Sequence, residues 1–380
     1  MKLAHRPILD RVRRFISVAS RLHYLTLLML SAFLFGGLQA ASAQDTTVAY
    51  VLHHGNDKLY AYRLQPNGIP TRIGPPLQTP FRQPRGLAID RKANFVFVGS
   101  WDHGIAIYRV RHSGALIYSG LVHTSKNPSQ LATDPKGPFL YAATTFGYIY
   151  EFRITRHGTL AALPLIKLNH SVDYIAINPA GTLAYVVTGF GNDVNPRYIY
   201  VYKIQTDGQL HYVEHVESKK YDTLWRAYVD PTGHYLYVND FWFHCVVTYH
   251  INTDGTIERL HKLVRMGSLM GFSPKGHIAY LLKEGQFSHN RKIASYKVDT
   301  NGALTLIGHP SGEVIAPHIY DFAFDPSLHV AIVASDTAIG IYHVNKDGVI
   351  MSQGQFYDAR WNALSHESLL VLGHLKAPGL

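Results

Sequence analysis

One short phrase occurs seven times in this chain of 380 residues. In each copy a run of aromatic and aliphatic residues leads into Asp-Gly, Asn-Gly or a close variant, as in VYKIQTDGQL at 201–210. The glycines of successive copies are 46, 44, 50, 47, 47 and 46 residues apart; they are Gly68, Gly114, Gly158, Gly208, Gly255, Gly302 and Gly348. So regular a period means that one structural unit is repeated along the chain.

The repeated phrase predicts a β-hairpin. Tyr202 and Ile204 are two residues apart, which places both side chains on one face of a strand, and Lys203 then points to the other face. The turn follows at Asp207-Gly208. Glycine adopts a positive φ without steric cost and aspartate tolerates it better than most residues do, as a tight hairpin turn requires. We therefore expect one such hairpin in each repeat.

A second phrase precedes the later hairpins, as in YIAINPAGTLAYVVT at 174–188. It combines an apolar strand rich in small residues, a turn with proline and glycine, and a strand rich in Tyr, Val and Leu. Four strands in each of seven such units predict an all-β fold, a seven-bladed β-propeller with four antiparallel strands per blade. A solenoid is the alternative. We expect one propeller domain over 44–380.

The two ends of the chain favour a closed ring. The sequence enters the pattern in the middle of a unit, at TTVAYVLHH (46–54), and ends in two strand-like fragments, ARWNALS (359–365) and SLLVLG (368–373). A solenoid needs polar caps at its ends, whereas a ring closes when a C-terminal strand completes the first unit. We expect N- and C-terminal strands to share a blade, and either fragment can supply the closing strand.

The N-terminal part differs in character from the rest. Basic residues precede the apolar run at 24–35, and Ala-Ser-Ala follows at 41–43, a pattern that predicts a cleavable signal peptide over 1–43. An uncleaved anchor is the alternative, but the run is short for a bilayer span of about 20 apolar residues. The single cysteine, Cys245, cannot form an intramolecular disulfide. We expect a periplasmic or secreted protein that its core alone stabilises.

Charge limits the partners. The signal peptide holds six of the 36 lysines and arginines and one of the 26 acidic residues, so its removal lowers the formal net charge from +10 to +5. The remaining basic residues form no long run, which argues against nucleic acid as a partner. We expect a small-molecule ligand, no cofactor, no contact with a membrane after cleavage, and a monomer.

The two phrases, x-x-L-A-x-D-P-x-G-x-x-x-Y-V and V-Y-x-I-x-x-D-G-x-L, resemble those of the seven-bladed lactonase family, which includes bacterial 6-phosphogluconolactonase and fungal carboxy-muconate cyclase. The resemblance covers residues 46–373 and implies the fold. It implies the activity less directly, because the matching residues are scaffold residues and one fold hosts many functions.

The resemblance also implies where a site would lie. Family activity is attributed to histidine, arginine and acidic residues at the starts of the innermost strands, which open into the central channel. Where the family typically has His-Pro-His in the third unit, this chain has Ser-Val-Asp at 171–173. The candidate catalytic residues are Asp321, Arg226 and Asp173, and the candidate ligand-binding residues are Arg85, Arg360 and His318. Arg360 falls at the expected position only if ARWNALS closes the ring.

Such a cluster can open a lactone ring with water. Asp321 or Asp173 would take a proton from the attacking water. The guanidinium groups of Arg226, Arg85 and Arg360 would stabilise the developing oxyanion or hold a carboxylate or phosphate of the substrate. The alternative interpretation is that these polar residues hydrate the channel mouth or bridge neighbouring blades.

Other features carry less information. The 23 histidines include pairs such as His211 and His215, but metal sites need three or four converging ligands, and we expect no metal. The aromatic residues at 241–243 and the segments 188–198 and 284–291 lie in predicted loops, where binding residues are often carried.

The sequence thus predicts an exported lactonase-like propeller that binds a small anionic or sugar-derived ligand at the channel mouth, with hydrolysis of a lactone as its candidate reaction. The competing class is a non-catalytic propeller that presents one face to a protein or a polysaccharide.

Overall fold

The computed structural model describes residues 45–102, 104–188, 197–219, 222–241, 244–263, 267–283, 292–307, 319–335, 338–351, 355–357 and 368–376. Thr46–Leu375 forms one compact unit. The predicted signal peptide and most of the predicted long loops lie outside the described residues, so those expectations stay predictions.

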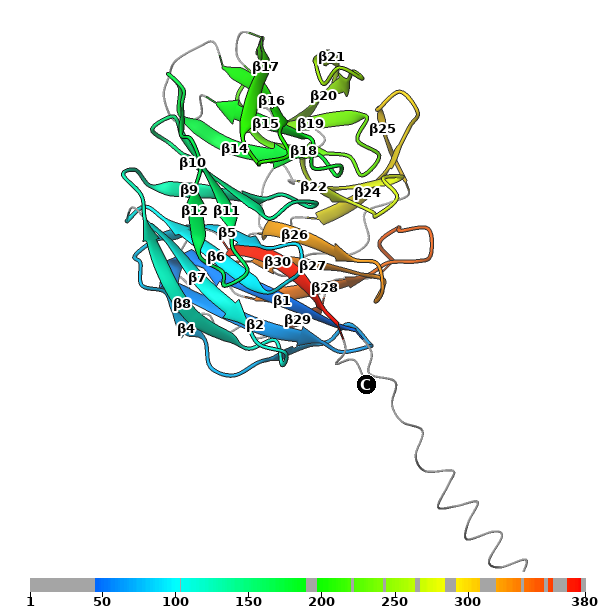
Figure 1. Cartoon of the computed structure of the whole chain (residues 1–380). Helices are drawn as coiled ribbons and strands as arrows, with labels where there is room; N and C mark the ends of the chain where they lie inside the picture. The colour runs from blue at the N-terminus through cyan, green and yellow to red at the C-terminus, as the bar shows by residue number, and fades with distance from the viewer. Residues whose placement is uncertain are drawn as a thin grey trace, which may run out of the picture. The chain divides into compact units, whose positions relative to one another are not determined.

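Seven antiparallel sheets build this unit, which confirms the predicted seven-bladed β-propeller (Figure 1). Blade 1 consists of β5 (Pro84–Ile89), β6 (Phe95–Ser100), β7 (Gly104–Val110) and β8 (Leu116–His123). Blade 2 consists of β9 (Pro128–Thr133), β10 (Phe139–Thr144), β11 (Tyr148–Ile154), β12 (Leu160–Ala162) and the short β13 (Ile166–Lys167). Blade 3 consists of β14 (Val172–Ile177), β15 (Leu183–Thr188), β16 (Tyr198–Ile204) and β17 (Leu210–Glu217).

Blades 4 to 6 follow the same order. Blade 4 consists of β18 (Leu224–Val229), β19 (Tyr235–Asp240), β20 (Cys245–Ile251) and β21 (Ile257–Leu263). Blade 5 consists of β22 (Ser268–Phe272), β23 (Ile278–Lys283), β24 (Lys292–Val298) and β25 (Leu304–Leu306). Blade 6 consists of β26 (Ile319–Asp325), β27 (Val330–Ser335), β28 (Ile339–His343) and β29 (Gln355–Tyr357). Blade 7 combines β30 (Ser368–Leu375) with β1 (Thr46–His53), β2 (Lys58–Leu64), β3 (Pro70–Arg72) and β4 (Leu77–Gln78), and a single 3-10 turn, η1 (His54–Asn56), follows β1.

The C-terminal strand closes the ring. β30 pairs with β1 in antiparallel register, from Thr46 opposite Leu375 to His53 opposite Ser368, and the two strands lie side by side in Figure 1. The closing strand is therefore SLLVLG with its continuation, while ARWNALS lies outside the described residues. A chain whose last strand pairs with its first is a ring, which excludes the solenoid.

The repeated hairpins connect each blade to its neighbour. Tyrosines of the second strands donate hydrogen bonds from their phenol groups to carbonyl oxygens of hairpin glycines in the next blade: Tyr50 to Gly114 (2.9 Å), Tyr141 to Gly208 (2.8 Å), Tyr237 to Gly302 (2.9 Å) and Tyr280 to Gly348 (2.6 Å). Gly208 has a φ of 94°, and a Cβ there would lie 2.2 Å from the Phe139 ring. Only glycine fits this turn and this contact, which explains why the glycine recurs.

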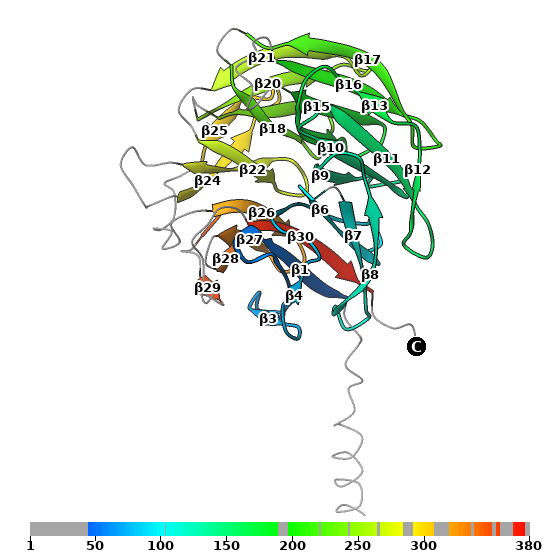
Figure 2. The same ribbon diagram turned by 90° about the vertical axis from the view of Figure 1, so that its left-hand side faces the viewer.

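The innermost strand of each blade faces the central channel. In Figure 2 the inner strands β9, β18, β22, β26 and β30 lie toward the middle of the unit, and β8, β12 and β17 lie at its periphery. Near its start, the inner strand of each of blades 1 to 6 shifts register against the second strand; the shifts occur in β5, β9, β14, β18, β22 and β26. Such a β-bulge redirects side chains. The predicted site residues Arg85, Asp173, Arg226 and Asp321 lie at these bulges.

Candidate active site at the channel mouth

Three polar residues hold equivalent positions in three inner strands. Tyr174 in β14, Arg226 in β18 and Asp321 in β26 each lie four residues before the polar residue that begins the following turn. Equivalent positions in a propeller lie at the same height around its channel. The three side chains also interact electrostatically. Burial and Tyr228 raise the pKa of the Tyr174 phenol, Asp321 raises it further, and Arg226 lowers it.

Arg226 reaches across the channel. Its Nη1 donates a hydrogen bond of 2.8 Å to the carbonyl oxygen of Tyr320 in blade 6, and its guanidinium lies 4.5 Å from the centre of the Trp225 ring. The side chain also hydrogen-bonds to Tyr228. Only 9% of the residue is exposed. A buried guanidinium held by a carbonyl, a phenol and an aromatic face is a fixed positive charge, because its planar fork is preorganised for several partners.

Asp321 joins blade 6 to the closing strand. Its Oδ2 accepts the backbone N–H of Leu370 in β30 and its Oδ1 accepts that of Phe322, both at 2.9 Å. Burial raises the pKa of the Asp321 carboxyl above its ordinary value, while Arg226 and the two N–H groups favour the charged form and limit the rise. Each carboxylate oxygen has a second lone pair, so this half-buried group can still accept a proton from a water molecule.

Tyr228 lies beside this pair. It lies two residues after Arg226 on the same strand, and its ring centre is 6.1 Å from that of Tyr174. The corresponding positions in blades 1, 2, 3, 5 and 6 hold only small residues, namely Ala88, Ala132, Ala176, Gly271 and Ala323. Burial raises the pKa of both tyrosines. Their phenols therefore stay protonated at neutral pH and can donate hydrogen bonds.

The other predicted site residues have separate surroundings. Asp173 lies in the bulge of β14 and is buried. Arg85 lies in the bulge of β5, where its guanidinium stacks 4.9 Å from the centre of the exposed Trp101 ring. Both sit at the same end of their inner strands as the central cluster. His318 and Arg360 lie outside the described residues.

Sequence reasoning missed the two tyrosines. The pattern that predicts the site consists of histidine, arginine and acidic residues, and Tyr174 and Tyr228 lie outside it as residues of apolar strands. An alignment of the inner strands by their turn residues would have shown Tyr228 as the large residue among small ones.

A metal or membrane role finds no support in the part of the chain described. There, no three His, Cys, Asp or Glu side chains converge in a way that could hold a metal ion. Nor does any helix among these residues have the length and apolar character needed to cross a bilayer. Cys245 is buried in β20.

The chain is a seven-bladed propeller, and part of it is similar to the lactonase family. Residues 144–271 match the family model described as lactonase, 7-bladed beta-propeller. This match, together with the seven-bladed structure, confirms the resemblance predicted from the repeats.

Solved structures share the whole propeller. The periplasmic gluconolactonase of Pseudomonas aeruginosa superposes with a TM-score of 0.70 at 15% identity, covering 88% of this chain and 100% of that one. A Lactobacillus plantarum protein gives 0.70 at 17% identity, covering 87% and 99%. At these identities the likeness shows the fold. Among curated proteins, none matches this sequence.

Proposed function

We propose that this chain is an exported lactonase that opens the ring of a small sugar-derived lactone at the channel mouth. The observation that carries the proposal is the pairing of a buried arginine with a carboxyl of raised pKa, Arg226 with Asp321, beside two phenol donors. The family match and the gluconolactonase neighbour support the same reaction class.

The reaction needs one base and one set of cationic or neutral donors. Asp321 takes a proton from a water molecule, whose oxygen then bonds to the lactone carbonyl carbon. Arg226 and the Tyr228 phenol stabilise the negative charge that develops on the carbonyl oxygen. The bond from the carbonyl carbon to the ring oxygen breaks, and the ring oxygen takes the proton that Asp321 accepted from water, which makes it the hydroxyl of the product acid and returns Asp321 to its carboxylate form. A raised pKa makes Asp321 a stronger base than an ordinary aspartate.

Arg85 and Asp173 have supporting roles in this proposal. Arg85 provides a cation at the same end of the channel, suited to a carboxylate or phosphate carried by the substrate. Asp173 is a second carboxylate at the equivalent bulge of β14. His318 and Arg360 remain candidates from the sequence alone.

Hydrolysis assays on the mature chain test this proposal. Residues 44–380 would be incubated with glucono-1,5-lactone and with 6-phosphogluconolactone, and acid release would be followed against the spontaneous rate. We expect hydrolysis above that rate. If 6-phosphogluconolactone is hydrolysed faster than glucono-1,5-lactone, the arginine cations at the channel mouth bind the phosphate of the substrate. If neither lactone is hydrolysed faster with the protein than in buffer alone, the proposed lactonase activity is rejected.

A non-catalytic role is the second candidate, and one observation favours it. Both oxygens of Asp321 already bond to backbone N–H groups, as they would in a residue whose task is to hold the ring closed. If the chain binds gluconate in calorimetry yet hydrolyses no lactone, the channel mouth is a binding site for sugar acids. Binding without turnover therefore separates the two candidates.

Export is part of the proposal and has its own test. N-terminal sequencing of the protein recovered from the periplasm or the medium should begin at Gln44, directly after the Ala-Ser-Ala motif. A protein that keeps Met1 in the cytoplasm would contradict it.

A further inference from the structure

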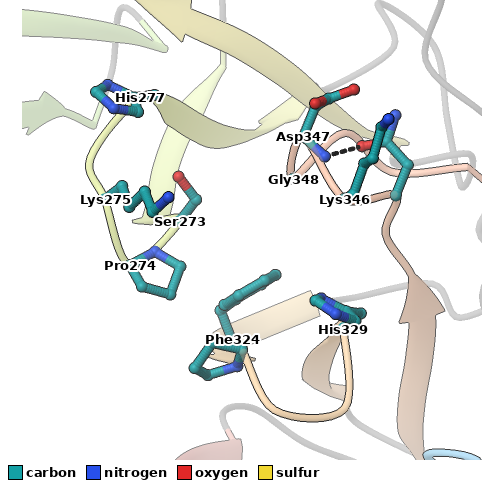
Figure 3. A pocket seen from close by; sticks show the side chains of 11 residues that line it. Ser273, Pro274, Lys275, His277, Phe324, His329, Lys346, Asp347 and Gly348 are labelled. Carbon is teal, nitrogen blue, oxygen red and sulfur yellow. Dashed lines mark hydrogen bonds between the residues drawn. The ribbon is translucent and has the colours of Figure 1, made fainter.

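A cavity of about 540 Å³ lies far along the inner strands from the channel cluster. Asp321 lies near the start of β26, whereas this cavity lies beyond the other end of that strand. Three turns surround it: the turn from β22 to β23, the turn from β26 to β27, and the hairpin turn after β28 (Figure 3). Its volume falls within the range of pockets that hold small organic ligands.

The residues that line the cavity combine positive charge with apolar surface. Lys275 and His277 come from the first turn, His329 from the second and Lys346 from the third, and Asp347 is the only acidic residue among the lining residues. All four basic side chains are exposed. Phe324, Pro274 and Pro326 contribute apolar surface. Figure 3 shows these side chains around one open space, with Pro274, Lys275 and His277 on one side of the view, Lys346 and Asp347 on the other, and Phe324 beside His329.

His329 has an unusual backbone. Its φ is 52°, in the left-handed region that favours glycine, whereas the equivalent residues of blades 3, 4 and 5, Thr182, His234 and His277, do not have a positive φ. The backbone N–H of Val344 donates to the His329 carbonyl at 2.9 Å, and the equivalent hydrogen bonds to Thr182, His234 and His277 are present in blades 3, 4 and 5. Histidine adopts this conformation more readily than most residues, but non-glycine residues held in it cluster at ligand sites.

We propose that this cavity binds a small organic anion, a carboxylate or phosphate monoester carried on an apolar ring. The anionic group lies between Lys275 and Lys346, where each ammonium acts as a point charge. The imidazoles of His277 and His329 donate hydrogen bonds to the same group. The ring rests on Phe324 and the two prolines.

Calorimetry with phenyl phosphate tests the site, because this probe carries both a ring and a dianion. Benzyl alcohol is the matched neutral probe. We expect phenyl phosphate to bind the mature chain with a dissociation constant of about 1 mM or tighter, as a ligand of this size can, and benzyl alcohol to bind at least tenfold more weakly. Equal binding of the two probes, or no heat from phenyl phosphate, overturns the proposal.

Variants locate the probe. K275M and K346M should each weaken binding about threefold and together about tenfold, as for exposed charge pairs. K92M is the control, since Lys92 lines the equivalent groove between blades 1 and 2, which has a volume of about 460 Å³ and no histidine. If K92M weakens phenyl phosphate binding as much as K275M does, any surface cation can bind the probe. If Arg226→Ala weakens binding and K275M does not, the probe binds in the channel. Either result overturns the proposal.

His329→Gly gives a second, independent test. Glycine relieves the positive φ, so the melting temperature should rise while phenyl phosphate binding falls about threefold. A variant that is more stable and binds as tightly as the wild type would show that the strain serves no ligand and would remove His329 from the site.

Discussion

Arg226 in blade 4 donates a hydrogen bond to the backbone carbonyl of Tyr320 in blade 6, over a distance of 2.8 Å and past the intervening blade 5. The next residue along, Asp321, accepts the N–H of Leu370 in the closing strand. One arginine and one aspartate thus connect three blades at the place where we propose the chemistry. Variants of either residue therefore need a stability measurement beside every activity measurement.

Replacing Arg226 by lysine tests the guanidinium. Lysine keeps the charge but cannot reach the Tyr320 carbonyl, the Tyr228 phenol and an oxyanion together. We expect kcat/KM for the preferred lactone to fall about a hundredfold, as when an oxyanion donor is lost. The melting temperature is the control; a variant that keeps full activity would show that Arg226 serves only to bridge the blades.

The pH dependence of stability tests the environment of Asp321. Its pKa is raised in the folded chain, so the protonated form stabilises the fold below the unfolded pKa of about 4, and this contribution is lost as the pH rises through the folded value. The melting temperature of the wild type relative to D321N should therefore fall over the pH interval that begins at about 4 and ends above the folded pKa. A relative stability that rises over this interval would mean that the pKa is lowered.

The same carboxyl sets the lower limb of the activity profile. If Asp321 is the base, kcat/KM should increase with pH as it ionises, with an apparent pKa above the ordinary value of about 4. D321N should abolish this limb along with most of the activity. An unchanged limb in D321N would assign the base to another group.

Tyr228 can be tested without disturbing the fold. Y228F keeps the ring and removes the hydroxyl that meets Arg226, and we expect a loss in kcat of about tenfold with little change in melting temperature. Y228A recreates the small residue that other blades carry at this position and should widen the channel, raising KM. Full activity in both variants would exclude Tyr228 from the site.

Tyr237→Phe is the matched structural control. Tyr237 is fully buried and its hydroxyl donates to the Gly302 carbonyl in the next blade. Its removal should lower the free energy of unfolding by about 1 to 2 kcal/mol, because a buried carbonyl loses its partner, and should leave kcat/KM unchanged. Lower activity in a fully folded sample of this variant would mean that contacts between blades affect the activity. A loss of activity in the channel variants would then not show that their side chains take part in the reaction.

The fold followed from the sequence because its cause is local and repeated. The pair Tyr202 and Ile204, with Lys203 facing outward, and the turn at Gly208 lie as expected, with Tyr202 buried and Lys203 exposed. The closing strand could not be chosen in advance. Its partner β1 lies at the far end of the chain, and both C-terminal fragments are short and strand-like.

The site was predicted only in part, for a similar reason. The resemblance to the family's inner strands suggested Arg226 and Asp321 as candidates, because blade repeats preserve position. It could not show that Arg226 reaches past blade 5, or that Asp321 holds the closing strand, since both contacts join segments distant in the sequence. The cavity beside His329 depends on three turns meeting and left no single motif.

The most direct test is the rate of lactone hydrolysis by the mature wild-type chain beside Arg226→Ala, measured on samples whose melting curves show both to be folded. The account predicts hydrolysis well above the spontaneous rate for the wild type and a loss of at least about a hundredfold in the variant. Equal rates for the two folded proteins, or a wild-type rate no greater than that in buffer, would contradict it.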